Sequence, residues 1–592
     1  MAATLSSSLL LAVVRLCVAT DSVYNDDLAS YVTRPDLRPP KIEVHTHDPS
    51  AIAPGYWFVA PYSHLEPEPY TKKFIPCQVG PHIYDNTGEL VWSGACKFKN
   101  RNAFDFRPID GGSEPRLSLI LGDVLEIGAG MKGMYVILNS SYQTVQALPA
   151  PAGSSMIDMH EFEVLEGGQR ALVIAQKAQL LDTNPIAGTV GAMWVLNNGF
   201  LEVDMMTGGT VFEWWALDYV DLGETYTVPP RGPGTFESPW DFFHLNSIDK
   251  NRDGDYLISA RNANTVYKIS GSTKEVLWRL GGRTSTFQLE GFNFSKQHDA
   301  RFRPSGNTSG TSISLLNNAA HDDELESTSA VLLFSLDEST MPFTARLEQK
   351  WSRLDGKVSR TRSNAQFLDN GNVFANWADR GYINEFTADG RCVLEARWLS
   401  GRFNNYRAFK AHFAGYPSEP PVLSAHAYGT TLETMTTVFH VSWNGATDVT
   451  SWNFFGSLAG SPADVRPVGS VTKSGFETMH MAAGLFRMSY AEARDAHGVS
   501  LGRSPITSTT ISPAVLDLLG KISLSATPGA PPSAVTSPLT ESRYSTSSDA
   551  VGTSRVMYDV LSTPYAIAVL SMIVLACFLR KFLKWRSLRL RS

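Results

Sequence analysis

The sequence predicts an all-β protein: a six-bladed β-propeller, then an immunoglobulin- or fibronectin-like β-sandwich, and one C-terminal transmembrane helix. Three observations support this prediction. The chain of 592 residues contains 46 Gly and 33 Pro, which favour turns over long helices. A hairpin pattern recurs six times along the first two thirds of the chain. One uncharged segment near the C-terminus is long enough to cross a bilayer.

The recurring unit is a strand, a tight turn, a second strand and then an aromatic residue, and it predicts a propeller at residues 41–415. The first and last aromatic residues are 306 positions apart over five intervals, so the mean period is about 61 residues. Four strands with long loops fit that period, whereas an irregular β-sandwich with coincidental hairpins is the alternative. The aromatic residues are Trp92, Tyr142, Trp215, Trp278, Trp351 and Trp398.

The pattern changes after Pro417. Residues 418–512 contain several short predicted strands and suit a β-sandwich with a buried Trp. Residues 513–559 are rich in Ser, Thr and Pro, a composition that buries too little apolar surface to fold, so we predict a linker. Residues 560–579 carry no charge, and residues 580–592 include six Lys or Arg and no acid. These two segments predict a transmembrane helix and a basic cytoplasmic tail.

The N-terminal residues 1–19 are mostly apolar and end in the small-residue sequence Cys17-Val18-Ala19. This pattern predicts a secretory signal peptide, with an N-terminal helix of the folded domain as the alternative. With a cleaved signal, we expect a single-pass membrane protein of the secretory pathway whose bulk is extracellular or luminal.

The cysteines and glycosylation sequons agree with that compartment. Cys77 and Cys96 are close enough in sequence to form a disulfide, which would leave Cys392 over. Three Asn-X-Ser/Thr sequons could be glycosylated there, at Asn139, Asn293 and Asn307.

Charge and motifs exclude several functions. The chain has 51 Lys plus Arg against 58 Asp plus Glu, a balance that gives no electrostatic basis for binding nucleic acid. It contains no phosphate-binding loop, no G-x-S-x-G nucleophile elbow and no H-E-x-x-H or C-x-x-C motif. Nucleotide-dependent transfer and the common hydrolase mechanisms therefore lack support.

A second hairpin pattern carries the candidate chemistry. In four predicted hairpins, at residues 160–176, 244–261, 298–318 and 364–377, a polar residue begins the first strand. Because the first strand of each propeller blade lines the central channel, residues at equivalent strand starts converge on one mouth of that channel. We therefore expect three imidazoles to meet there. The polar residues are His160, His244, His298 and Asn364.

The hairpin at 244–261 gives a more specific prediction. Pairing the strands outward from a turn centred on residues 251–254 sets His244 opposite Arg261. Side chains at opposite positions of paired strands have Cβ atoms about 5 Å apart. Asn246, two residues beyond His244, should point to the same side of the strand. One blade would thus present His, Asn and Arg together.

Other interpretations remain open for these residues. A single His at a strand start is commonly a hydrogen-bonded turn residue, and three imidazoles can bind zinc. Arg261 argues against a metal because a guanidinium repels a dication, whereas it suits an anionic substrate. We expect neither a resident metal nor a cofactor. Residues 249–255 resemble the start of a calcium loop, but Ala260 replaces the required Glu, so we predict a hairpin turn.

Several segments resemble the arylsulfotransferase (ASST) family, specifically its fungal-type branch. They are PGYWFVAPY (54–62), GPHIYDNTGELVWSG (80–94), HEF (160–162), HLNSIDKNRDGDYLISAR (244–261) and QHDARF (297–302). The resemblance covers about residues 35–415. It implies transfer of a sulfuryl group from a phenolic sulfate ester to a phenol acceptor, without the nucleotide sulfate donor and through a sulfohistidine intermediate.

The resemblance also implies roles for individual residues. His298 would be the catalytic nucleophile, and His160, His244, Asn246 and Arg261 would bind the sulfuryl group. The chain departs from the family pattern in placing its sandwich after the propeller and in the predicted membrane anchor. The alternative function is a non-catalytic cell-surface or luminal propeller that binds an anionic ligand, a glycan or a protein.

Overall fold

In the computed structural model, the chain is described over most of its first 517 residues. The described residues are 27–62, 76–109, 114–127, 130–151, 156–165, 167–182, 191–304, 311–320, 327–339, 341–431, 433–513 and 515–517. Four predicted features lie outside them: the signal peptide at 1–19, the transmembrane helix at 560–579, the basic tail at 580–592 and the Asn307 sequon. Most of the linker at 513–559 also lies outside. Within the described ranges, no helix is long and apolar enough to cross a membrane.

The regular secondary structure of the described residues is almost entirely β-strand, as predicted, and the helices that lie wholly within them are short 3-10 turns. Between residues 42 and 411, these strands pair in six sheets. Sheet 1 contains, in order, β27 (Asn404–Ala411), β2 (Tyr56–Tyr62), β3 (His82–Tyr84) and β4 (Leu90–Ser93). Sheet 2 contains β5 (Asn102–Ile109), β6 (Arg116–Ile127), β7 (Gly130–Leu138) and β8 (Thr144–Leu148), with β9 (Ile157–Asp158) on β7. Sheet 3 contains β10 (Phe162–Val164), β11 (Arg170–Asp182), β12 (Ala192–Asp204) and β13 (Thr210–Trp215).

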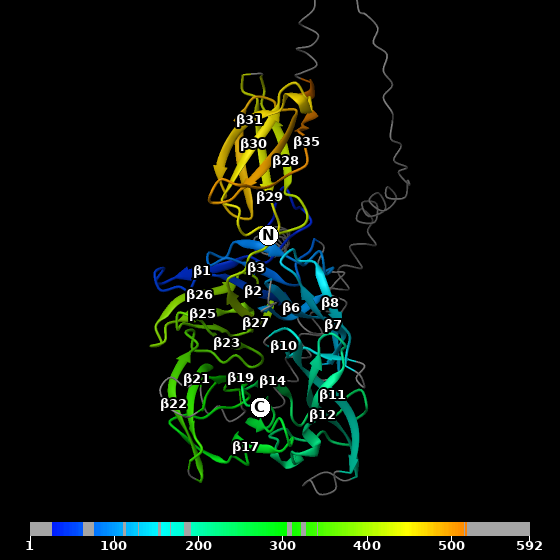
Figure 1. Cartoon of the computed structure of the whole chain (residues 1–592), viewed down its shortest axis with the longest axis vertical. Helices are drawn as coiled ribbons and strands as arrows, with labels where there is room; N and C mark the ends of the chain where they lie inside the picture. Colours follow the sequence, from blue (N-terminus) through cyan, green and yellow to red (C-terminus); the bar gives the residue numbers. More distant parts are fainter. Residues whose placement is uncertain are drawn as a thin grey trace, which may run out of the picture. The chain divides into compact units, whose positions relative to one another are not determined.

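The other three sheets repeat this order. Sheet 4 contains β14 (Leu245–Lys250), β15 (Tyr256–Ala260), β16 (Thr265–Ile269) and β17 (Val276–Gly281). Sheet 5 contains β19 (His298–Arg303), β20 (Thr311–Asn317), β21 (Ala330–Asp337), β22 (Phe343–Ser352) and β18 (Phe287–Glu290). Sheet 6 contains β23 (Asn364–Phe367), β24 (Val373–Asn376), β25 (Ile383–Phe386), β26 (Cys392–Trp398) and β1 (Ile42–Thr46). Figure 1 shows first strands such as β10, β14, β19 and β23 gathered centrally, while outer strands such as β17 and β22 lie at the edge.

Two further sheets follow in the chain. One contains β32 (Glu477–Ala483), β29 (Thr436–Ser442), β28 (Val422–Tyr428) and β36 (Thr510–Ile511). The other contains β31 (Arg466–Thr472), β30 (Ser451–Ser457), β33 (Met488–Arg494) and β34 (Ser500–Arg503), with β35 (Thr507–Ser508) on β33. Apolar side chains of both sheets share one core, in which Phe439 from the first sheet and Trp452 from the second are buried. The strands of this two-sheet unit fall within the range predicted for a sandwich, 418–512.

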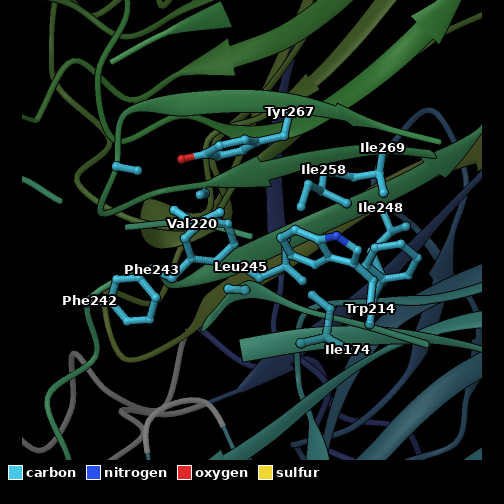
Figure 2. Packing of buried hydrophobic residues seen from close by; sticks show 14 of the residues in the cluster. Ile174, Trp214, Val220, Phe242, Phe243, Leu245, Ile248, Ile258, Tyr267 and Ile269 are labelled. Carbon is cyan, nitrogen blue, oxygen red and sulfur yellow. The ribbon is translucent and has the colours of Figure 1, made fainter. Parts of the chain in front are cut away.

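Five of the six predicted aromatic residues lie on the fourth strands of their sheets, whereas Tyr142 is buried in the turn between β7 and β8 of sheet 2. Trp92, Trp278, Trp351 and Trp398 are buried on the fourth strands of their sheets. In sheet 3, however, the buried residue is Trp214, and the predicted Trp215 is only half-buried. Successive side chains of a strand point to opposite faces, so Trp214 enters the core shared with sheet 4 and Trp215 packs at the edge of the core shared with sheet 2. The sequence pattern did not distinguish the two. Figure 2 shows Trp214 packed among aliphatic residues of the adjoining sheet.

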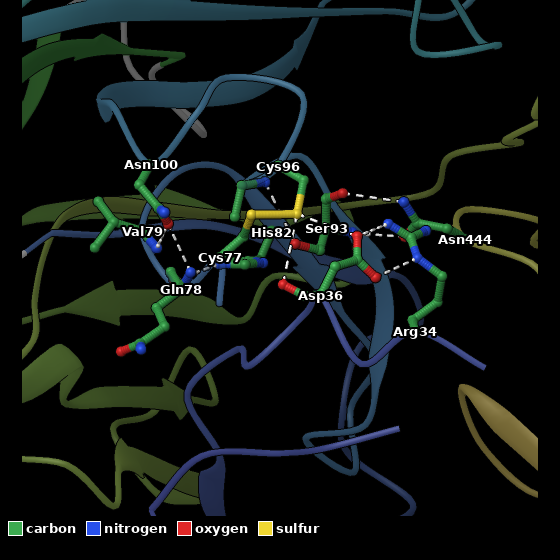
Figure 3. Close-up of a disulfide and its surroundings, with 11 residues drawn as sticks. Arg34, Asp36, Cys77, Gln78, Val79, His82, Ser93, Cys96, Asn100 and Asn444 are labelled. Atoms are coloured by element: carbon green, nitrogen blue, oxygen red, sulfur yellow. Dashed lines mark hydrogen bonds and ion pairs between the residues drawn. A yellow bond between two sulfur atoms is a disulfide. The ribbon is translucent and has the colours of Figure 1, made fainter. Parts of the chain in front are cut away.

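A disulfide joins the segments on either side of β3 and β4. The sulfurs of Cys77 and Cys96 are bonded to each other, the pairing that their spacing allowed, and Cys392 is free. Figure 3 shows the polar contacts around this bond. The Ser93 amide donates to Asn444 Oδ1 at 2.8 Å, which connects the end of β4 to the sandwich.

One buried ionic network connects the first strands of all six sheets. Its centre is Glu161, which directly precedes β10 and is fully buried. Its carboxylate accepts hydrogen bonds from Arg107 of β5 at 3.0 Å, Arg301 of β19 at 2.8 Å and Arg407 of β27 at 2.8 Å. The amide of Ile248 in β14 also donates to it, at 3.2 Å. Burial raises the pKa of Glu161, but the three guanidiniums outweigh this effect and hold the pKa far below its usual range.

Two aspartates complete this network. Asp105 accepts from Arg407 at 2.9 Å, and Asp299 accepts from Arg301 at 2.8 Å. Asp299 also accepts from the amide of Ala365 in β23 at 3.0 Å, which brings in sheet 6. Both aspartates lie in β-bulges and have positive φ angles, 49° and 56°, which Asp tolerates better than most residues. The two bulges thus place the carboxylates of Asp105 and Asp299 beside the three arginines that surround Glu161.

We predict that Glu161→Ala lowers the free energy of unfolding by about 3–5 kcal/mol, because it leaves buried guanidiniums without their shared carboxylate. Urea denaturation followed by Trp fluorescence measures this loss. The control is Glu290→Ala, which removes a partner of Arg346 from a pair whose side chains are 37% and 74% exposed. That control should lose less than about 1 kcal/mol. Equal losses in the two variants would contradict the role of the network.

Candidate active site

The three predicted histidines meet at one end of the first strands. His160 precedes β10, His244 precedes β14, and His298 begins β19, so the rings come from three different sheets. The ring centroids of His160 and His244 are 5.2 Å apart, and those of His160 and His298 are 6.2 Å apart. The structure therefore brings these side chains together, as the shared register predicted.

His160 and His244 are each oriented by an aspartate. His160 Nδ1 lies 2.8 Å from Asp158 Oδ1, and His244 Nδ1 lies 2.5 Å from Asp241 Oδ2. Burial raises the pKa of Asp158 to about 7, so the Asp158–His160 pair can hold or release one proton near neutral pH. The pKa of Asp241 is instead lowered: burial opposes this, but His244 and several hydrogen bonds outweigh it. A carboxylate at this position can stabilise positive charge on His244.

The environment of His298 selects one tautomer. Its Nδ1 lies 2.8 Å from Asn318 Oδ1 and 3.2 Å from the Lys296 carbonyl oxygen. The Asn318 amide nitrogen donates to the carbonyls of Ser359 and Arg362, at 2.6 and 3.2 Å, which leaves its oxygen facing the ring. Since Nδ1 faces two acceptors, it carries the proton, and the lone pair of the neutral ring is on Nε2.

The same surroundings keep His298 neutral. Burial lowers the pKa of His298 well below its usual value, and the charge of Arg261 and the neighbouring rings of His160 and His244 lower it further. No hydrogen bond joins the Nε2 atom of any of the three rings to another side chain or backbone group in the described ranges. The three Nε2 atoms are thus available to a ligand.

His244 and Arg261 are opposite each other, as predicted. The Arg261 amide donates to the His244 carbonyl at 3.0 Å. Two irregularities compensate to give this register: the turn spans five residues, 251–255, and a β-bulge lies at Asn246. The bulge changes the role expected for Asn246. Its amide nitrogen donates to the Gln297 carbonyl at 2.9 Å, and its buried Oδ1 has no hydrogen-bond partner among the described residues.

Two arginines face this site without a carboxylate partner in the described ranges. The guanidinium of Arg261 donates to the Arg360 carbonyl at 3.1 Å and to Asn262 Oδ1 at 3.4 Å. Arg362 contributes a second guanidinium, whose carbon lies 5.5 Å from the ring centre of Tyr62. The sequence pattern missed Arg362 because it precedes β23 in a loop, where no strand register marks it.

The other residues singled out in the sequence, Asn364 and the sequon residues Asn293 and Asn139, do not join the histidine cluster. Asn364 bonds to the backbone of Ala408 through both its amide atoms, so it links β23 to β27 rather than joining the histidines. The sequon residue Asn293 is exposed, whereas Asn139 Oδ1 accepts two backbone hydrogen bonds within its own turn. Within the described parts of the chain, no three or more His, Cys, Asp or Glu side chains are placed to hold a metal ion.

Three Nδ1-bonded imidazoles beside two guanidiniums that have no carboxylate within 4.0 Å among the described residues are groups that can bind an anion. Residues 120–398 match the model of the arylsulfotransferase (ASST) family. This matched range contains the three histidines and both arginines of the site. No curated protein matches the chain.

Solved structures show only weak similarity. A protein of unknown function from Bacteroides caccae is 12% identical, with 60% of this chain and 99% of that chain covered and a TM-score of 0.32. The GH43 BlXynB protein from Bacillus licheniformis is 9% identical, with 68% and 88% covered and a TM-score of 0.26. Virginiamycin B lyase from Staphylococcus aureus is 9% identical, with 64% and 83% covered and a TM-score of 0.24. Similarity at this level carries no argument about this chain.

We predict that the imidazole of His298 is neutral and protonated at Nδ1 at pH 6, which ¹⁵N NMR of histidine-labelled protein measures directly. Asn318→Asp should raise the pKa of His298, because a carboxylate at Nδ1 stabilises the imidazolium form. Asn318→Leu is the control, since it removes the acceptor without adding charge. A proton on Nε2 in the unaltered protein would contradict the tautomer derived from Asn318.

Proposed function

We propose that this protein is a nucleotide-independent aryl sulfotransferase of the fungal-type ASST branch, built on a six-bladed β-propeller. The family match over residues 120–398 supports the activity. The propeller is supported by the order of sheets 1–6, by the pairing of β27 with β2, and by the network that joins all six first strands. The observation that carries the proposal is the free Nε2 of a neutral His298 beside the unpaired Arg261 guanidinium.

In the first step, the Nε2 lone pair of His298 attacks the sulfur of a phenolic sulfate ester. A sulfur–nitrogen bond forms, the bond from sulfur to the aryl oxygen breaks, and a sulfohistidine results. In this proposal, Arg261 and His244 bind the sulfuryl oxygens and stabilise the charge that shifts during transfer. The departing oxygen leaves with the electron pair of the broken bond.

The leaving phenolate needs a proton, and the Asp158–His160 pair can supply it. The pair can hold a proton near neutral pH, and the His160 ring lies between the other two rings. In the second step, a phenol acceptor returns its proton to this pair. Its oxygen then attacks the sulfur of the sulfohistidine, the sulfur–nitrogen bond breaks, and neutral His298 is restored.

The compartment and the membrane anchor belong to the same proposal. We propose that the folded region lies in an oxidising compartment of the secretory pathway. The disulfide between Cys77 and Cys96 and the exposed sequon at Asn293 support this placement. The anchor at residues 560–579 lies outside the described part of the chain and stays a prediction from its uncharged sequence.

We predict that His298→Ala abolishes phenol release from 4-nitrophenyl sulfate in the presence of a phenol acceptor, a loss of at least about 10³-fold in kcat, because the proposed nucleophile is removed. His45→Ala is the matched control, since His45 lies on β1 with a side chain that is 54% exposed. The unaltered protein should show parallel lines in double-reciprocal plots with two substrates. Undiminished release in His298→Ala would refute the mechanism, and absence of release from the unaltered protein would favour the non-catalytic anion-binding alternative.

We also predict the pH profile with a phenyl sulfate whose phenol is a poor leaving group. The acid limb should lie well below pH 6.5, the ordinary pKa of His, because only neutral His298 attacks and its pKa is lowered. A basic limb should appear near pH 7, since the Asp158–His160 pair donates only while it holds its proton. Asp158→Asn should remove that basic limb. A basic limb unchanged in Asp158→Asn would contradict the assignment of the proton donor.

A further inference from the structure

The segment that precedes β23 contacts two parts of the proposed site: the Asn318 side chain that orients His298, and the Arg261 guanidinium. The carbonyl of Arg362 accepts a hydrogen bond at 3.2 Å from Asn318, whose oxygen orients His298. Two residues earlier, the carbonyl of Arg360 accepts from the Arg261 guanidinium at 3.1 Å. The backbone of this segment therefore connects to the nucleophile at one point and to the arginine beside it at the other.

The side chain of Arg362 is not used in holding the fold together. Its guanidinium donates a hydrogen bond to the neighbouring Thr361 hydroxyl at 3.3 Å and lies over the ring of Tyr62. Tyr62 is fully buried, and its hydroxyl has no hydrogen-bond partner within the described ranges. A stacked guanidinium keeps its planar edge free for a bidentate contact with an anion.

The two arginines at this end of the strands differ from those of the buried network in their contacts. Among the described residues, no carboxylate lies within 4.0 Å of the guanidinium of Arg261 or Arg362, whereas Arg107, Arg301 and Arg407 each contact several. Burial lowers the pKa of Arg261, the charge of Asp241 opposes this effect, and the charge of Arg362 lowers the pKa further, so the two guanidiniums are close enough to affect each other. A sulfate monoester carries a single negative charge, which Arg261 alone can balance.

We propose that the substrates of this site are phenols that carry a carboxylate on the aromatic ring, with Arg261 binding the sulfuryl group and Arg362 binding the carboxylate. This inference rests on the proposed sulfotransferase function and specifies its substrate class. The fully buried Tyr62 ring supports the guanidinium of Arg362 from below, and the edge of the guanidinium faces the carboxylate. The same contacts serve donor and acceptor, because both are phenols differing only in sulfation.

The test compares 3-carboxy-4-nitrophenyl sulfate with its methyl ester, two donors that differ in the charge at one ring position. The unaltered protein should prefer the acid by at least about tenfold in kcat/KM, the size expected of a charge-assisted bidentate contact. Arg362→Gln should lower kcat/KM for the acid at least about tenfold more than for the ester. Arg397→Gln is the matched control, an arginine on β26 with a side chain that is 58% exposed, and it should retain the preference.

Equal use of acid and ester by the unaltered protein would overturn the inference while leaving sulfuryl transfer intact. An equal loss for both donors in Arg362→Gln would also overturn it. Calorimetric binding of the two free phenols separates the inference from the reaction. If neither donor turns over but the acid phenol binds more tightly, and Arg362→Gln removes that difference, the carboxylate site stands and the transferase proposal fails. Absence of both turnover and preference overturns both.

Discussion

The structure depends on one buried carboxylate shared by three guanidiniums. Glu161 lies between strands that are far apart in sequence, and each arginine around it would be costly to bury without it. Because Glu161 follows His160 directly and Asp299 follows His298, the network that joins the sheets also places two of the three imidazoles. The same ionic network therefore holds the sheets together and positions the histidines of the site.

The arginines of this molecule fall into two groups, those that form ion pairs within the fold and those that have no direct carboxylate partner among the described residues. Arg107, Arg301 and Arg407 contact carboxylates and are satisfied within the fold. Arg261 and Arg362 lie near the histidines and have no carboxylate within 4.0 Å among the described residues; a backbone carbonyl contacts Arg261, and the Tyr62 ring lies against Arg362. Leaving a guanidinium uncompensated opposes stability, and it is useful where an anion binds during turnover.

Strand periodicity predicted much of this arrangement from the sequence. Alternating hairpins give the strand starts, and equal register brings His160, His244 and His298 to one end. The sequence correctly predicted that His244 and Arg261 lie opposite each other, although the turn is longer than predicted and the strand contains a bulge. The bulge at Asn246 compensates for the longer turn and restores the predicted register. Bulges depend on tertiary contacts, so periodicity alone does not reveal them.

What periodicity missed were the partners that make the site chemically specific. Asp158 ends the two-residue strand β9, and Asp241 and Arg362 lie in loops, where side-chain direction depends on the folded chain rather than on alternation. Asn318 follows β20 and reads in sequence as an ordinary turn residue. Glu161 and Asp299 stand in the HEF and QHDARF segments that resemble the arylsulfotransferase family. Their role depends on contacts with strands from separate sheets, which the sequence does not show.

The central claim is that Nε2 of His298 takes the sulfuryl group, and mass spectrometry of the protein tests it most directly. The full chain is mixed with an aryl sulfate in the absence of acceptor, quenched in alkali and digested. We expect one SO₃ adduct on the peptide that contains His298, lost when a phenol acceptor is added before the quench. Phenol release with no adduct on that peptide, or an adduct on His160 or His244 instead, would contradict the account.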